Sequence, residues 1–166
     1  MKAELRKLSI MDGEVLYRMA LEIGPSEYGF VNGLYVDTFE EFQEKVQQYI
    51  NMSQGKNLGP DMVPQTVYWL YIDGEPVGYG KLRHELNDEL RSYGGHIRFV
   101  IRPSCRGKGY GKIFMGELLK EAKRKKIGLV LITCDQDNLA SRRVIEANYG
   151  VLSELKDGVC KYWMRT

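Results

Sequence analysis

The chain has 166 residues and a net charge of only +2, which is too small to indicate a nucleic-acid or membrane-surface partner. Hydrophobic residues make up 43% and charged residues 28%, a balance typical of a globular protein, and the length predicts a single domain over residues 1–166. The start of the chain lacks the apolar core of a signal peptide, and the three cysteines are widely spaced. We therefore expect a cytoplasmic protein without a disulfide framework or a metal site.

The first third of the chain predicts a strand and two helices. In order, these segments are a strand at residues 5–10, a short helix at 13–22, a loop rich in Gly, Pro and aromatics at 24–36, and a second helix that ends before Gly55. Asp37 and Glu40 form a pattern close to a capping box at the start of the second helix. The apolar side of this helix comprises Phe39, Phe42, Val46, Tyr49 and Ile50.

The rest of the chain alternates strands with two further helices. Strands at 66–72 and 76–82 flank Asp73-Gly74-Glu75, which is a hairpin signal, and a strand at 95–101 follows. A helix begins near Tyr110 and places Phe114, Leu118, Leu119 and Ala122 on one face. The chain then predicts a buried strand at 129–133, a helix at 138–148, and a closing hairpin of strands at 152–155 and 159–164.

The most informative segment is the turn at residues 102–112, which reads R-P-S-C-R-G-K-G-Y-G-K between a strand and a helix. A helix start leaves backbone N–H groups unpaired, and the helix dipole adds partial positive charge there, so such a turn can bind phosphate. The turn holds three glycines, which let an anion approach the backbone, and three cations: Gly107, Gly109, Gly111, Arg106, Lys108 and Lys112. This composition predicts a pyrophosphate site.

Two common phosphate-binding motifs do not fit the spacing of this turn. A Walker loop would need Gly where Arg106 stands, and Ser or Thr where Ile113 stands. A dinucleotide fingerprint needs G-x-G-x-x-G after the first strand, whereas these glycines alternate late in the chain. The spacing therefore argues against a protein that binds nucleotide phosphates through this turn, although such a protein remains one alternative interpretation.

The pattern R-x-x-G-x-G at 106–111, preceded by I-R-P at 101–103, resembles the coenzyme A pyrophosphate loop of the GNAT superfamily of N-acetyltransferases. The resemblance continues with N-L-A-S at 138–141 and G-V at 150–151, and it spans residues 67–151 in order and spacing. It implies an α/β (α+β) fold with a central mixed, mostly antiparallel sheet, flanking helices and a splayed pair of strands. It also implies acetyl-CoA as cosubstrate and an amine as acceptor, and such domains often form homodimers through their C-terminal strands.

The resemblance assigns cofactor contacts to the strand before the turn, to the turn itself and to the start of the later helix. These residues are Phe99, Val100, Ile101, Arg106, Gly107, Lys108, Gly109, Tyr110, Gly111, Lys112, Asn138 and Ser141. Residues 99–101 would bind the pantetheine arm through their backbone. Asn138 would hydrogen-bond the arm of the cofactor, cap its own helix, or do both.

Acetyl transfer requires a neutral amine, and deprotonating an amine with a pKa of about 10.4 at pH 7 costs about 4–5 kcal/mol. His96 is the first candidate base because it stands close to where many GNAT members carry a catalytic glutamate. The alternative is a partly buried histidine bonded to a backbone carbonyl. His84 is the second candidate base, and it could instead line the acceptor site or cap a turn. The loop aromatics that would cover the acceptor, or simply pack, are Tyr28, Phe30 and Tyr35.

The usual catalytic acid of the family is less evident in this sequence. Many members carry a tyrosine in the helix after the position of Asn138, but Val144 and Ile145 occupy the closest positions here. Tyr149, about one turn later, is the candidate acid, with packing at the helix end as the alternative. The missing tyrosine also leaves open a second function, an acyl-CoA-binding regulatory module without catalysis.

Overall fold

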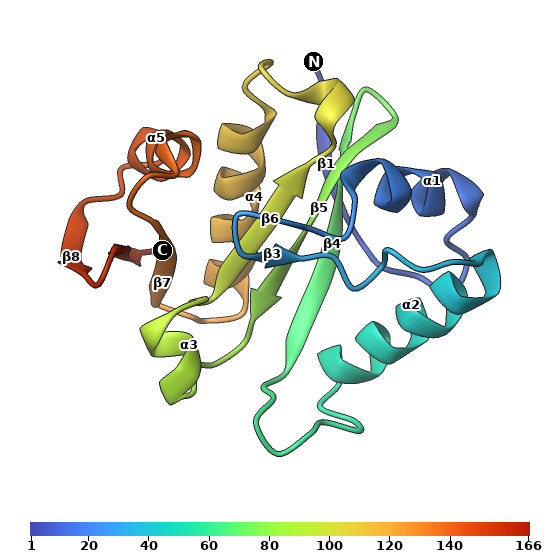
Figure 1. Cartoon of the computed structure of the whole chain (residues 1–166), viewed down its shortest axis with the longest axis horizontal. Coiled ribbons are helices and arrows are strands. Elements are labelled where there is room, and N and C mark those ends of the chain that lie inside the picture. Colours follow the sequence, from blue (N-terminus) through green and yellow to red (C-terminus); the bar gives the residue numbers. More distant parts are fainter.

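Two antiparallel sheets with helices packed against them form the fold (Figure 1). The computed structural model describes residues 1–166. In chain order the elements are β1 (Ala3–Lys7), α1 (Glu14–Ile23), β2 (Ser26–Glu27), β3 (Phe30–Val31), α2 (Phe39–Ser53), β4 (Gln65–Ile72), β5 (Glu75–Arg83), α3 (Asp88–Ser92), β6 (Ile97–Ile101), a 3₁₀ turn (Pro103–Cys105), α4 (Tyr110–Arg124), β7 (Leu129–Asp135), α5 (Leu139–Ala147), β8 (Leu152–Lys156) and β9 (Val159–Arg165). This arrangement confirms the predicted α/β class.

The larger sheet has the strand order β1-β4-β5-β6, and the smaller one has the order β7-β9-β8. All neighbouring strands within them are antiparallel. β6 is an edge strand of the larger sheet and β7 is an edge strand of the smaller one. These two strands face each other but form no ladder of hydrogen bonds. They meet only at the start of β6, where the N–H of His96 donates to the carbonyl of Leu131 at 2.8 Å. This is the splayed strand pair that the sequence resemblance implied.

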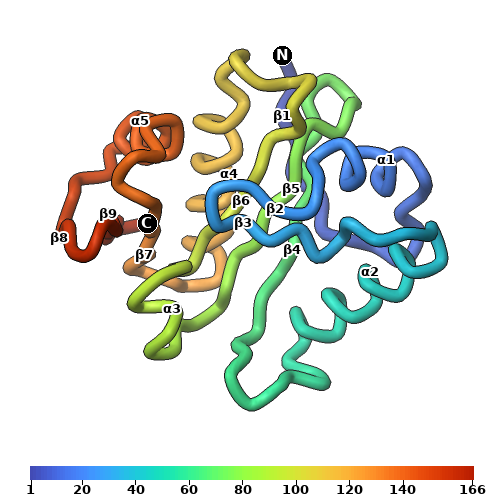
Figure 2. The backbone as a smooth tube through the Cα atoms, in the orientation of Figure 1, coloured from blue at the N-terminus to red at the C-terminus, as the bar shows by residue number.

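The period-two alternation of side chains gives the larger sheet two buried faces. On one face, Val67, Trp69 and Tyr79 pack with residues of α1 and α2. On the other face, Tyr68 and Leu82 pack with residues of α4 and of the smaller sheet. Figures 1 and 2 show α1 and α2 on one side of this sheet and α4 on the other. Burial of such large apolar side chains contributes roughly 1.5–3 kcal/mol each.

The expected capping pattern of Asp37 and Glu40 at the start of α2 is wrong. Thr38, and not Asp37, is the N-cap, because its Oγ1 accepts a hydrogen bond from the N–H of Glu41 at 3.1 Å. The carboxylate of Glu41 accepts from the N–H of Asp37 at 3.4 Å, one residue before the N-cap, and so does not complete a capping box. The helix ends at Ser53, before Gly55 as predicted.

The strands predicted at 5–10 and 95–101 have different bounds in the structure. β1 ends at Lys7 because the N–H of Ser9 donates to the carboxylate of Asp12 at 2.8 Å and the chain turns there. β6 begins at Ile97, two residues later than predicted, because Gly95 has φ +62° and lies against the carbonyl of Leu131. A Cβ on this glycine would be 2.4 Å from that oxygen, so the close approach of the two sheets requires glycine.

Two short elements were not predicted. The loop at 24–36 contains the β2–β3 hairpin, whose turn residues Tyr28 and Gly29 both have positive φ. Such a turn usually carries Asn-Gly or Asp-Gly, so a tyrosine there gives no sequence signal. The five residues of α3, capped by Asn87, are too few to show a helical period. The hairpin contacts β6 and crosses in front of it in Figure 2.

None of the helices combines the length and the hydrophobicity that crossing a membrane requires.

Candidate functional site

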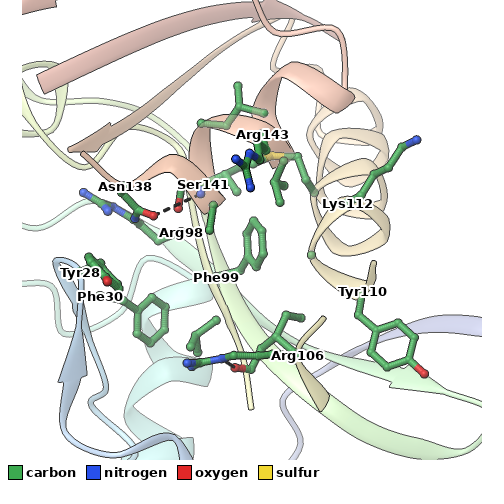
Figure 3. A pocket seen from close by; sticks show the side chains of 18 of the residues that line it. Tyr28, Phe30, Arg98, Phe99, Arg106, Tyr110, Lys112, Asn138, Ser141 and Arg143 are labelled. Carbon is green, nitrogen blue, oxygen red and sulfur yellow. Dashed lines mark hydrogen bonds between the residues drawn. The ribbon is translucent and has the colours of Figure 1, made fainter. Parts of the chain in front are cut away.

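A cavity of about 620 Å³ occupies the gap between β6 and β7 (Figure 3). Strand β6 forms one wall, and β7 with α5 forms the other. The turn at 105–112 closes one end, and the β2–β3 hairpin contributes Glu27, Tyr28 and Phe30. All of the predicted cofactor residues except Lys108 line this cavity. The lining also contains Arg98 and Arg143, which the sequence did not single out.

The turn before α4 presents a row of backbone donors to the cavity. None of the N–H groups of residues 107–112 donates a hydrogen bond within the chain, because each precedes the first donor of the helix ladder. Gly107 and Gly109 have φ values of +77° and +81°, and the space where their Cβ atoms would project is open. Gly109 is the N-cap of α4 and has no side chain to cap the helix. Free N–H groups, a helix dipole and open space together suit a phosphate group.

Arg106 is held across the cavity mouth from the turn to the β2–β3 hairpin. Its Nε donates to the carbonyl of Ile101 at 2.9 Å, and its Nη1 donates to Glu27 at 2.8 Å. Its Nη2 also pairs with the Glu27 carboxylate. Both side chains are partly exposed, and an ion pair of this kind contributes about 0–1 kcal/mol. A phosphate group can therefore compete with Glu27 for this guanidinium.

His96 has a structural role that argues against its use as a general base. Its Nδ1 accepts a hydrogen bond from the N–H of Leu131 at 2.9 Å, and its side chain is only 5% exposed. It does not line the cavity. Burial, and then the charges of Arg83 and Arg91, lower the pKa of His96 to about 4, so the ring is neutral with its proton on Nε2. In a neutral ring protonated on Nε2, only Nδ1 can accept a proton, and the N–H of Leu131 already bonds to it. The partner of the ring is therefore a backbone N–H and not the expected carbonyl.

His84 is not brought to the cavity either. Its Nε2 lies 2.7 Å from the Oγ1 of Thr66 on β4. Burial, and then the charge of Lys125 beyond α4, lower the pKa of His84. The side chain thus lies near the C-terminal end of α4, away from the residues that line the gap between β6 and β7. His84 is therefore hydrogen-bonded to Thr66 of the sheet and does not line the site of the amine acceptor.

Tyr149 matches neither of its sequence-based interpretations. Its side chain is 93% exposed, so it packs against nothing at the helix end, and it does not line the cavity. It follows the C-cap Asn148 and has φ +68°, the left-handed conformation that ends many helices. Its N–H donates to the carbonyl of Glu146 at 3.0 Å, so its backbone is what closes α5. Val144 and Ile145 line the cavity instead, as aliphatic groups without a proton to donate.

Asn138 caps α5 as predicted. Its Oδ1 accepts a hydrogen bond from the N–H of Ser141 at 3.2 Å, which Figure 3 shows as a dashed line. Both residues line the cavity, and no group of the chain accepts a hydrogen bond from the Nδ2 of Asn138. Of the loop aromatics, Tyr28 and Phe30 line the cavity, whereas Tyr35 does not.

Sequence reasoning missed the two arginines of the lining for different reasons. Arg98 alternates with the buried Ile97 along β6, a pattern that indicates a strand and nothing more. Its guanidinium stacks over the ring of Tyr93 at 4.5 Å, a contact that depends on the fold. Arg143 follows Ala140 by three residues and precedes Ala147 by four, so helical spacing along α5 could have placed it on the cavity side.

Between the two edge strands, the cavity combines free backbone N–H groups with cationic side chains, a set of groups suited to a phosphorylated ligand. A family model described as the acetyltransferase (GNAT) family matches residues 28–151, and the chain belongs to this family. Acetyl-CoA is the cosubstrate of the family, as the sequence resemblance implied. No curated protein sequence matches the chain.

Solved structures of GNAT proteins have the same fold. RimL, a ribosomal L7/L12 α-N-protein acetyltransferase in complex with coenzyme A, is 21% identical with a TM-score of 0.72, over 99% of this chain and 94% of that one. The N-acetyltransferase PseH of Campylobacter jejuni with acetyl coenzyme A is 9% identical with a TM-score of 0.65, over 99% of both chains. The PaiA N-acetyltransferase of Thermoplasma acidophilum with coenzyme A is 22% identical with a TM-score of 0.64, over 100% of both.

Proposed function

We propose that the protein is an acetyl-CoA-dependent N-acetyltransferase that moves the acetyl group directly to a primary amine in a ternary complex. The observation that carries this proposal is the cavity between β6 and β7, one end of which is closed by the turn whose N–H groups at residues 107–112 are free. Membership of the GNAT family and the coenzyme A complexes of proteins with this fold support it.

The chain has groups suited to each part of the cosubstrate. The N–H groups of residues 107–112, with Arg106 and Lys112, would bind the pyrophosphate. The unpaired backbone edge of β6 at residues 99–101, with the Nδ2 of Asn138, would bind the pantetheine arm. When bound, acetyl-CoA supplies a thioester with a thiol leaving group of pKa about 8.5, which departs without a strong acid.

No histidine lines the cavity, and its one carboxylate, Glu27, lies beside Arg106, at the end of the cavity that we assign to the pyrophosphate and not to the thioester. We therefore assign removal of the amine proton to water and not to a side chain. Arg98 in the cavity wall, with Lys81 opposite it on β5, would put positive charge beside an acceptor bound there. Like charges lower the pKa of an ammonium group, so they increase the neutral fraction of a bound amine. In the transfer, the amine nitrogen bonds to the acetyl carbon, the carbon–sulfur bond breaks, the thiolate leaves and the amine proton passes to solvent.

The test is acetyl-CoA-dependent release of free thiol with a panel of primary amines, with the acetylated amine identified by mass spectrometry. Thiol release that matches product formation in amount supports the proposal. Binding of acetyl-CoA without transfer to any amine, or slow hydrolysis alone, would instead support a regulatory acyl-CoA-binding module. Competition by ATP at concentrations near that of acetyl-CoA would support a nucleotide-phosphate binder.

A homodimer through the C-terminal strands remains a prediction. β8 is the outer strand of the smaller sheet, and its residues are exposed.

A further inference from the structure

A second cavity, of about 340 Å³, lies on the α2 side of the larger sheet. Its walls come from α2, from the loop before β4, from β5 and from α3. Three cations line it, Lys45, Lys81 and Arg83, together with one carboxylate, Asp61. Asp61 is exposed, and none of the three cations forms an ion pair. With three cations and one carboxylate, the lining of this cavity has a net positive charge.

The two cations on β5 are partly removed from water. Burial, and then the charges of Arg83 and Arg98, lower the pKa of Lys81 to about 8. Burial, and then the charge of Arg98, lower the pKa of Arg83 to about 10. Charge that is desolvated without a counterion is unfavourable, so an anion that enters this cavity gains more than it would at an exposed cation.

Arg83 is held in a position to bind such an anion. Its Nη1 donates to the carbonyls of Gly94 and Gly95 at 3.2 and 3.0 Å, which fixes the guanidinium from one side. No group of the chain accepts a hydrogen bond from its Nε or Nη2. A fixed guanidinium with free donors suits a carboxylate, which it can bind through two hydrogen bonds.

Lys81, which lines the second cavity, lies beside two residues that line the first. Lys81 on β5 stands directly opposite Arg98 on β6, so their side chains project from the same face of the sheet. The Nζ of Lys81 also lies 5.5 Å from the centre of the Phe30 ring. Arg98 and Phe30 both line the first cavity, between β6 and β7. A molecule bound to Lys81 would therefore lie close to the part of the first cavity that Arg98 and Phe30 line.

We infer that the second cavity is the acceptor subsite, and that the acceptor is a small amine that also carries a carboxylate, as an amino acid does. This inference rests on the proposed function and names the substrate class for it. Arg83 and Lys81 would bind the carboxylate, and the amine would lie toward Arg98. The same cations disfavour a protonated amine, so one set of charges both selects the acceptor and promotes its neutral form.

The kinetic test compares amino acids with their amides, for example alanine with alaninamide, as acceptors at saturating acetyl-CoA. The α-amine of an amino-acid amide is less basic than that of the free amino acid, so a larger fraction of it is neutral at a given pH. Without recognition of the carboxylate, the amide should therefore be the better acceptor. We expect the wild type to prefer the acids by about 10-fold or more in kcat/KM, and Arg83→Gln and Lys81→Met to lose most of this preference. The control is Arg91→Gln, because Arg91 is exposed on α3 and lines neither cavity. Equal use of acids and amides by the wild type, or a preference unchanged in both variants, would overturn the inference.

A binding measurement decides the question even if no amine in the panel is turned over. Met52 and Met62 line the second cavity, so ¹³C-labelled methionine methyl groups report on its occupancy by NMR. We expect N-acetylalanine to shift these two signals saturably, and N-acetylalaninamide to shift them about 10-fold more weakly. The response should disappear in Arg83→Gln. No saturable shift with the acid, or equal shifts with the amide, would contradict the inference. Failure of acetyl-CoA to bind in a separate titration would instead contradict the proposed function, which keeps the two failures distinct.

Discussion

Replacing His96 by asparagine should make the protein more resistant to acid. The ring is neutral in the folded protein, with a pKa of about 4 against 6.5 for an unperturbed histidine. The unfolded chain therefore binds the proton more tightly, and the free energy of unfolding falls as the pH decreases from 6.5 toward 4. At pH 5 the two pKa values give a loss of about 2 kcal/mol relative to pH 7.5.

The His96→Asn variant keeps the local hydrogen bond and removes the titration. The Oδ1 of asparagine can take the place of Nδ1 and accept from the N–H of Leu131, which lies 2.9 Å from Nδ1 in the wild type. His84 also has a lowered pKa, but it is present in both proteins and its contribution cancels. Replacement by leucine instead would leave the N–H of Leu131 without a partner and should cost about 1–3 kcal/mol at every pH.

The assay is urea unfolding of wild type and variant at pH 7.5 and pH 5.0. Between these pH values the wild type should lose about 2 kcal/mol more than His96→Asn does. The variant should also retain its turnover rate and its pH profile if His96 only joins the two sheets. Equal acid losses in the two proteins would refute the reasoning about the histidine, and a large loss of turnover in a fully folded variant would restore it as a candidate base.

Three further predictions concern the turn, the end of α5 and the start of α2. Gly109→Asp puts a negative charge beside the phosphate-binding N–H groups and should weaken acetyl-CoA binding by roughly 10-fold or more by calorimetry. Gly74→Asp, at the same kind of positive φ with open space in the β4–β5 hairpin, is its control and should leave affinity unchanged. Tyr149→Gly should raise the free energy of unfolding by up to about 1 kcal/mol without changing turnover, because glycine adopts the left-handed conformation freely; reduced turnover would point to an acid role. Thr38→Ala should lower the free energy of unfolding by about 1 kcal/mol, and no change in urea unfolding would remove its capping role.

The sequence predicted the features whose causes are local. The turn at 102–112 could be interpreted because glycine spacing and a following helix determine where N–H groups are free. The helices α2 and α4 could be predicted because each has an apolar face at helical spacing. The N-cap of α2 lies one residue later than the sequence predicts, because the side chain of Thr38 and not that of Asp37 caps the helix.

The features that the sequence could not give depend on register between distant strands. His96 looked like a base because its position in the chain is close to the turn, but its environment is set by Leu131 on another sheet. Lys81 and Arg98 are far apart in sequence, and only the β5–β6 register places them opposite each other. The pairing of Arg106 with Glu27 likewise depends on a hairpin whose turn carries no standard sequence signal.

The most direct test of the account is a calorimetric titration of the purified protein with acetyl-CoA, with ATP as the control ligand. Saturable micromolar binding of acetyl-CoA, with none of ATP and a clear loss in Gly109→Asp, is the result that we predict. Absence of acetyl-CoA binding to a protein shown to be folded would contradict the assignment of the turn at 106–111, and the proposed acetyl transfer with it.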